Sequence, residues 1–349
     1  MRTFLYKSIL YVLLVLCLTA VVIHVCLRCK PDYFLGVKFD YDLCNYQYRQ
    51  MASKSPYRNI IIGDSRGNAA IDPTLLGKDW INLSLPGGTF FEGYLTLKRF
   101  LSMNAADTLV MVYGIDLIEA PSIWFNVRTV PFQFPTYTEV ESLQALERRF
   151  HVPYLGGYPY DVHGLTLIQL ERRLRYQHSP LVYQQTFLDA LNRYIRPTDE
   201  SSQFTHFNDH RGQLNFGNKD SSDETRFTQT MLNNAFNPNK INLCYLDSII
   251  DLAAKNKTTV FFVMAPLNRR SYELYENSPY AKSFDHFMDS ISAIYPYMKI
   301  PAAPSHLDNR YFGDGLHLNA RGTAYFTGML RGIWNEYLFY RTFAHGDKK

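Results

Sequence analysis

The sequence has little charge, and that charge is not concentrated anywhere. Only 19% of its 349 residues are Asp, Glu, Lys or Arg, the formal net charge is +4, and the basic residues are scattered. Such a chain lacks the basic surface typical of a nucleic-acid-binding protein, so we expect no nucleic-acid partner. The hydrophobic share of 46% is instead enough for a well-buried core, in one large domain or in one domain with an insertion.

Cysteine is scarce and lacks the spacing of metal ligands. Five Cys residues are present, and an odd number of them, Cys29, Cys44 and Cys244, lie beyond the N-terminal apolar run. One disulfide and free buried thiols are equally open interpretations. No metal-ligand spacing is evident among the histidines of the middle region either: His151, His163, His206 and His210. The sequence therefore predicts neither a metal nor a cofactor.

One long hydrophobic run stands at the N-terminus. Ser8 to Leu27 contains no Lys, Arg, Asp or Glu and follows a short basic lead, Met1 to Lys7. About 20 apolar residues is the length of a helix that spans a bilayer. The alternative is a cleaved signal peptide, but the run is long for one and no A-x-A-like cleavage site follows it. We therefore expect residues 1–30 to form a cytoplasmic tail and an uncleaved transmembrane anchor.

The orientation of this anchor is not decided by charge. Arg2 and Lys7 on one side are balanced by Arg28 and Lys30 on the other, so the positive-inside count is nearly even. So short an N-terminal tail is easily left in the cytoplasm. We therefore expect a single-pass protein of the cell (inner) membrane, with the bulk of the chain on the extracytoplasmic, periplasmic side.

Apolar runs alternate with helical stretches after an aromatic-rich connector at residues 31–57. The pattern predicts strands at 60–62, 80–83, 108–113 and 258–264, and helices at 92–103, 245–256 and 320–340. Strands that alternate with helices imply right-handed crossovers and a parallel sheet. The fold class predicted for residues 58–349 is therefore a three-layer α/β domain.

Turns with small or polar residues begin where three of these strands stop. They are Gly63-Asp64-Ser65, Pro86-Gly87-Gly88 and Gly114-Ile115-Asp116. Ligands of parallel sheets bind beyond the carboxyl ends of the strands, so we expect the three turns to converge on one functional edge. Residues from about 118 to 240 break the strand–helix pattern, and we expect them to form an insertion or cap beside that edge.

Ser65 and two residues near the C-terminus, Asp314 and His317, have the chemistry of a nucleophile, an orienting group and a base. A Ser hydroxyl needs a base within hydrogen-bond reach before it can attack. His317 can take that proton and return it to a leaving group, while Asp314 orients the imidazole. The alternative is that Asp314 caps the last helix and His317 is a surface residue. We predict a Ser65–His317–Asp314 triad.

These segments resemble, in order, the four blocks of the SGNH (GDSL-like) hydrolase superfamily. Gly63-Asp64-Ser65 resembles the first block, Asn82 to Thr89 the second, Gly114-Ile115-Asp116 the third and Asp314-x-x-His317 the last. The resemblance implies a three-layer, flavodoxin-like fold with Ser65, His317 and Asp314 as catalytic residues. It also implies an oxyanion hole that includes the backbone N–H groups of Ser65 and Gly87.

The third block departs from the family pattern, because Asp116 stands where the family has an Asn that donates to the oxyanion. An ionised carboxylate at that place repels an oxyanion. Three alternatives remain: Asp116 is protonated, it binds a substrate hydroxyl or amine, or it is structural and another group donates. Asn68 and Asn82 are candidates for that other donor.

A narrower resemblance includes the N-terminal span and the turn Pro266-Leu267-Asn268. The chain is similar to membrane-anchored proteins of envelope-polymer acylation, of the alginate O-acetylation and teichoic-acid D-alanylation types. This implies a serine O-acetyltransferase or acetylesterase that acts on a cell-envelope or exported carbohydrate polymer through an acyl-Ser65 intermediate. The implied partner is a multi-span membrane O-acyltransferase. The alternatives are a non-catalytic glycan-binding partner of that acyltransferase and a broad-specificity, lipase-like esterase.

The expected insertion offers further candidates for carbohydrate contact. Aromatic side chains that either pack on sugar rings or form the core of the insertion are Trp124, Tyr154, Tyr158 and Tyr160. A basic stretch, Glu171 to Arg175, predicts a solvated helix face, with binding of a polyanionic glycan as the alternative.

Overall fold

In the computed structural model the chain divides into two compact units. The described residues are 1–35, 38–154, 162–183, 187–190, 192, 201–217, 219–301 and 305–346. Met1–Tyr48 and Ile123–Phe204 form one unit, here the N-terminal unit, and Arg49–Ser122 and Thr205–Lys349 form the other, here the sheet unit. The expected insertion at 118–240 is thus divided between the two.

The sheet unit is built on a parallel sheet. Among the described residues its strands are β1 (Asn59–Gly63), β2 (Trp80–Asn82), β3 (Thr108–Val112) and β4 (Thr259–Phe262), in the spatial order β2-β1-β3-β4. All neighbouring pairs are parallel. Ile60, Ile61 and Ile62 are fully buried, as expected for a continuous apolar run covered on both faces. The predicted α/β class with a parallel sheet is confirmed.

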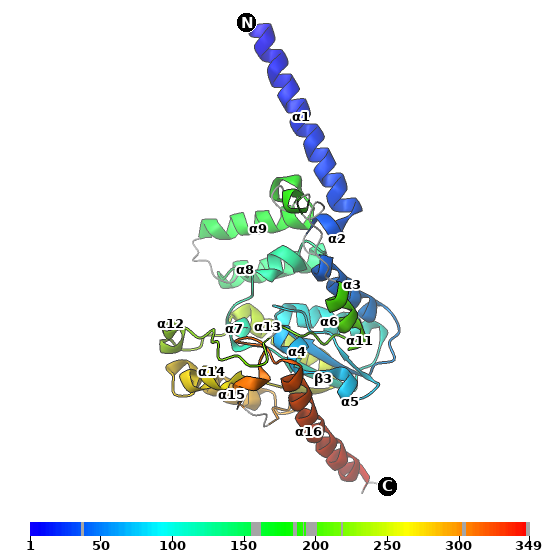
Figure 1. Cartoon of the computed structure of the whole chain (residues 1–349), viewed down its shortest axis with the longest axis vertical. Helices are drawn as coiled ribbons and strands as arrows, with labels where there is room; N and C mark the ends of the chain where they lie inside the picture. Colours follow the sequence, from blue (N-terminus) through cyan, green and yellow to red (C-terminus); the bar gives the residue numbers. More distant parts are fainter. Residues whose placement is uncertain are drawn as a thin grey trace. The chain divides into compact units, whose positions relative to one another are not determined.

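Helices pack on both faces of this sheet (Figure 1). Adjacent strand residues point to opposite faces, so Phe261 and Phe262 separate the two layers. Phe261 contacts α16 (Ala320–Gly346) through Trp334, on the face that also carries α4 (Ser65–Ala70) and α5 (Pro73–Leu76). Phe262 contacts Phe90 of α6 (Phe90–Met103), which packs against α13 (Lys240–Lys255).

Two of these helices begin earlier than the sequence pattern predicts, because polar caps fix their starts. The Thr89 hydroxyl and the Glu92 carboxylate form a capping box at the start of α6. The Asn239 side chain accepts from the backbone N–H groups of Ile241 and Asn242 at the start of α13. Periodicity of apolar residues alone does not locate such ends.

Short elements complete the sheet unit. The strands β5 (Leu267–Asn268) and β6 (His306–Leu307) form a small parallel pair. The short helices are α7 (Ile115–Glu119), α12 (Gln229–Asn233), α14 (Arg269–Tyr275) and the 3-10 turn Asn309–Tyr311, and a longer helix, α15 (Pro279–Ile294), follows α14.

The N-terminal unit is helical in its described part. Its elements are α1 (Arg2–Cys29), α2 (Pro31–Phe34), the π-helix Phe125–Thr129, α8 (Tyr137–Phe150), α9 (Val162–Tyr176) and the 3-10 turn Pro180–Val182. Two helices, α3 (Lys38–Ala52) and α11 (Ser201–Asp209), continue into the sheet unit. The stretch 31–57, expected as a connector, therefore holds α2 and α3.

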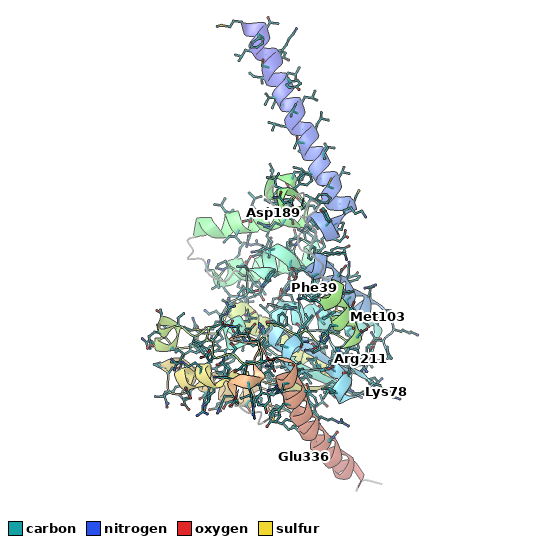
Figure 2. The ribbon with its side chains drawn as sticks, viewed as in Figure 1. Phe39, Lys78, Met103, Asp189, Arg211 and Glu336 are labelled. Atoms are coloured by element: carbon teal, nitrogen blue, oxygen red, sulfur yellow. The ribbon has the colours of Figure 1, made fainter. Side chains whose placement is uncertain are left out.

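The helix α1 is long and apolar enough to cross a membrane. Its segment Thr3–Cys29 has a mean hydropathy of 2.8, and no other helix of the described residues meets the same criteria. A signal sequence near an N-terminus can meet the same criteria. Along most of α1 the side chains are exposed and project outward from the helix (Figure 2).

Candidate active site

Ser65 lies in a turn that is fixed at the carboxyl end of β1. The buried Asp64 caps α4, because its Oδ1 accepts the Arg66 backbone N–H at 2.7 Å. Its Oδ2 accepts the Gly114 N–H at 2.7 Å, which ties the turn to the end of β3. Gly63 is required for this approach, since a Cβ there would lie 1.9 Å from the Val112 carbonyl oxygen. The Ser65 hydroxyl is therefore held at the edge of the sheet.

The structure brings together the three residues of the predicted triad. His317 Nε2 lies 2.7 Å from Ser65 Oγ, and His317 Nδ1 lies 2.8 Å from Asp314 Oδ2. When Nδ1 carries the proton and donates it to Asp314, Nε2 is free to accept the Ser65 O–H. This arrangement can move a proton from the hydroxyl to the imidazole.

Asp314 belongs to the loop of His317 and does not cap the last helix. Its Oδ1 accepts the backbone N–H groups of Leu316 and His317, both at 2.8 Å. Asn319 instead accepts the Gly322 N–H at the start of α16. Although burial acts to raise it, the hydrogen bonds from His317 and from these backbone groups lower the pKa of Asp314 to about 2. The carboxylate is therefore ionised at neutral pH.

A segment that we call the strap, residues 213–217 and 219–226, lies against the His317 loop. Phe216 stacks on the imidazole of His317 with ring centroids 4.4 Å apart. The Lys219 N–H reaches the Gly313 carbonyl, and Gly217, at φ +69°, lies so close to Gly313 that a Cβ would be 2.2 Å from the same oxygen. The strap comes from a polar, Asn- and Asp-rich stretch, so no pattern in the sequence identified Phe216.

The turn that contains Gly87 also lies at the end of β1. The Leu85 N–H donates to the Gly63 carbonyl at 2.9 Å, and the Gly88 N–H donates to Leu85 O at 2.6 Å. Gly87 has φ +64°, a left-handed conformation that favours glycine, and its carbonyl accepts the Ser122 hydroxyl at 2.8 Å. The three predicted turns therefore meet at one edge of the sheet.

Asp116 forms an ion pair with Arg66, the residue after Ser65. Arg66 Nη1 lies 2.6 Å from Asp116 Oδ1 and 3.6 Å from Asp64 Oδ2. Although burial acts to raise it, the Arg66 guanidinium holds the pKa of Asp116 below its usual value. This contradicts the alternative of a protonated Asp116. Only a glycine at position 114 leaves room for the pair, because a Cβ there would overlap Arg66 Nη1.

Asn68 and Asn82, the expected substitutes for the missing oxyanion donor, are both used inside the fold. Asn68 Nδ2 donates to the carbonyls of Ser84 at 3.0 Å and Gly212 at 2.9 Å. Asn82 Nδ2 donates to the carbonyls of Gly67 at 2.8 Å and Ile71 at 3.1 Å. Each amide has two N–H groups, so both are occupied and this hypothesis is wrong.

A cavity of about 460 Å³ opens beside the triad within the sheet unit. Its lining includes Arg66 and Asp116, and also Gly315 and Leu316 of the His317 loop. Its wall is mostly apolar or aromatic, with contributions from Met231, Met264, Tyr272, Phe284 and Met288. Apolar walls with a few charged groups are typical of small-molecule sites.

The other candidates of the sequence lie in the N-terminal unit. Trp124 is exposed, whereas Tyr154 is buried with its ring 5.2 Å from that of Phe125. Tyr158 and Tyr160 lie outside the described residues. The prediction of a solvated face is wrong for Arg172, which is fully buried.

Comparisons with known proteins add little. No protein-family model and no curated protein matches this chain. A solved structure of a Streptococcus pneumoniae protein, provisionally named a platelet activating factor, is 13% identical over 88% of this chain and 97% of that one, with a TM-score of 0.39. So weak a likeness carries no argument.

Proposed function

We propose that this protein is a membrane-anchored serine acyl-transfer enzyme of the SGNH (GDSL-like) type. It would act as an O-acetyltransferase or acetylesterase on a cell-envelope or exported carbohydrate polymer. The observation that carries the proposal is the chain of hydrogen bonds from Ser65 Oγ through His317 to Asp314, with distances of 2.7 and 2.8 Å. A nucleophile, a base and an orienting carboxylate in this geometry form the constellation of serine acyl transfer.

The reaction would proceed in two halves. Ser65 Oγ attacks the carbonyl carbon of the acyl donor while its proton passes to His317 Nε2. Asp314 holds the Nδ1 proton and stabilises the imidazolium, which then protonates the leaving group. In the second half an acceptor hydroxyl, or water, gives its proton to His317 and attacks acyl-Ser65, and Ser65 recovers its proton. A sugar hydroxyl as acceptor gives transfer, and water gives hydrolysis.

The oxyanion would be bound by backbone groups. Ser65 is the first residue of α4, where N–H groups have no acceptor within the helix. The Gly87 N–H is the second expected donor, and each such donor typically contributes about 3 kcal/mol in the transition state. Asp116 is not a donor in this proposal. Its carboxylate, paired with Arg66 at the cavity, would bind a hydroxyl or amine of the substrate.

The anchor would be retained in the mature protein. Ile23 and Leu27 of α1 are buried in a cluster with Tyr183 of the same unit, and His24 Nδ1 lies 3.1 Å from the His178 carbonyl oxygen. Cleavage after the apolar run would remove these contacts. In this proposal the protein lies in the inner membrane with the sheet unit on the periplasmic side. The proposed partner is the multi-span O-acyltransferase that the resemblance implies.

The test is acylation of the purified full chain by an activated acetyl ester. Intact-mass measurement should show one added acetyl group, peptide mapping should place it on Ser65, and Ser65→Ala should abolish it. Ser102→Ala, at an exposed serine of α6, is the matched control and should be acylated like the wild type. Equal labelling of the wild type and Ser65→Ala would overturn the proposal.

A non-catalytic glycan-binding partner is the second candidate, and the Arg66–Asp116 ion pair favours it. A carboxylate at this place supplies no donor to an oxyanion, yet it can accept hydrogen bonds from sugar hydroxyls. Glycan binding that survives Ser65→Ala, without acyl turnover by the wild type, would support this candidate.

The apolar cavity favours a third candidate, a lipase-like esterase. This candidate predicts fast hydrolysis of short-chain nitrophenyl esters without any partner.

A further inference from the structure

Two polar side chains of α9, Gln169 and Arg172, face the neighbouring helix α8. Arg172 and Glu147 of α8 are both fully buried, and the two guanidinium nitrogens Nη1 and Nη2 lie 2.9 and 3.0 Å from the Glu147 carboxylate oxygens. Gln169 Nε2 donates to the same carboxylate at 3.0 Å. The inner face of α9 is therefore held to α8 in part by a buried ion pair and an amide.

The opposite side of α9 presents leucines outward. Leu167 is 67% exposed and Leu170 is 52% exposed, and the partly buried Leu174 follows them at helical spacing. Residues at i, i+3 and i+7 lie on one face of a helix. A helix on the surface of a water-soluble protein has the reverse arrangement, with its apolar stripe toward the core. We call Leu167, Leu170 and Leu174 the leucine stripe.

The leucine stripe lies close to the end of the apolar helix α1. Tyr183 connects the two, because its hydroxyl donates to the Arg175 carbonyl at 3.0 Å and its ring packs in the cluster of Ile23 and Leu27. Figure 1 shows α9 running across the direction of α1 beside the C-terminal end of α1. If α1 spans a bilayer, α9 therefore lies along the membrane surface.

Two further exposed leucines lie in neighbouring segments of the same unit. Leu181 is 72% exposed and Leu188 is 54% exposed, and Figure 2 marks the adjacent Asp189 in this region. The Ala190 carbonyl accepts the hydroxyl of Tyr33, just beyond the end of α1. Isolated exposed leucines are common, but a group of them next to a membrane-length helix indicates a contact surface.

We propose that the leucine stripe, with Leu181 and Leu188, inserts into the interfacial layer of the bilayer that α1 spans. The occupant of this surface is lipid because the stripe continues the lipid-facing surface of α1. Arg28 and Lys30 at the end of α1 and Arg173 on α9 are exposed basic residues, and such residues suit anionic headgroups. The inference rests on retention of α1 as an anchor and is independent of the chemistry at Ser65.

The test uses the full chain in lipid nanodiscs that contain phosphatidylcholine, phosphatidylglycerol and lipids brominated at defined acyl positions. The fluorescence of Leu170→Trp is measured after subtraction of the wild-type signal. Brominated lipids should quench this emission, most strongly when the bromine lies near the headgroup. Ser142→Trp is the matched control, because Ser142 is exposed on α8 and lies two residues from Gln144, which contacts α9. Residues two apart point to different sides of a helix, so the control should not be quenched.

Two results would overturn the proposal. One is quenching of Leu170→Trp no greater than that of Ser142→Trp. The other is a blue-shifted emission that no brominated lipid quenches, because this would show that protein and not lipid covers the stripe. Leu167→Trp repeats the measurement one turn earlier in α9. If one of the two variants does not fold, the other still tests the proposal.

Discussion

Arg66 Nη1 lies 2.6 Å from Asp116 Oδ1, and this ion pair connects the residue after Ser65 with the end of β3. The two partners differ in burial, because the Arg66 side chain is 12% exposed and that of Asp116 is 50% exposed. Arg66 also faces the fully buried Asp64 at 3.6 Å. A single guanidinium therefore serves two carboxylates, and only that of Asp116 is exposed to solvent.

We expect Arg66→Met to destabilise the protein much more than Asp116→Asn. Loss of Arg66 removes the cation beside the fully buried Asp64, which then keeps only its hydrogen bonds from the backbone N–H groups of residues 66 and 114. Breaking a buried pair in this way costs about 3 kcal/mol. Loss of the half-exposed Asp116 charge costs less than about 1 kcal/mol. Denaturant unfolding of the two variants in detergent measures both free energies. Equal losses would mean that Arg66 does not stabilise Asp64.

Phe216→Ala should slow acylation of Ser65 while leaving the fold intact. The ring of Phe216 stacks on His317 with ring centroids 4.4 Å apart. Such aromatic pairs typically contribute about 0.5–1.5 kcal/mol, which here stabilises the imidazole in its catalytic position. A rate loss of about 2- to 10-fold follows. Stopped-flow acylation by an activated acetyl ester measures it, and Phe216→Tyr should restore most of the rate. Unchanged kinetics in Phe216→Ala would show that the stack does not position His317.

Gly217→Ala should destabilise the strap, because φ +69° and a contact of 2.2 Å with the Gly313 carbonyl leave no room for a Cβ. We expect a loss of about 1–3 kcal/mol and slower acylation. Gly328→Ala in α16 is the matched control. A Cβ there meets nothing within 4 Å, and replacing a helical Gly stabilises by about 0.5–1 kcal/mol. Thermal unfolding of both variants tests the contrast, which a loss in both would contradict.

Asp314 should contribute stability that is lost in acid. Its ordinary pKa of 3.8 applies to the unfolded chain, and its pKa in the folded protein is about 2. Between these pH values the unfolded chain binds a proton that the folded protein does not, so the free energy of unfolding falls as the pH falls. The stability difference between the wild type and Asp314→Asn should be constant above this window and shrink toward pH 2. A difference independent of pH would contradict the lowered pKa.

The parallel sheet could be predicted because each of its strands is marked by a short run of neighbouring residues in the sequence. A continuous apolar run such as Ile60-Ile61-Ile62, ended by a glycine, favours a strand that is buried on both faces. Turns at the carboxyl ends of parallel strands must meet at one edge of the sheet. The sequence alone therefore places Gly63-Asp64-Ser65 near Gly114-Ile115-Asp116.

Features that depend on pairs of side chains from distant segments could not be predicted. Phe216 and His317 stack although the sequence around Phe216 has no apolar period. Glu147 and Arg172 form a buried pair, although a basic helical stretch ordinarily indicates a solvated face. In each case tertiary contact overrides the local pattern. The ion pair between Arg66 and Asp116 also contradicts a protonated Asp116, an alternative that the sequence alone left open.

In the proposed enzyme His317 activates Ser65 as a nucleophile. Fluorophosphonates form a covalent bond with serines activated in this way, so the most direct measurement is labelling of the full chain followed by peptide mapping. We predict one labelled residue, Ser65, with labelling lost in Ser65→Ala and at least 100-fold slower in His317→Gln. Labelling at another residue, or equal rates for the wild type and His317→Gln, would contradict the account.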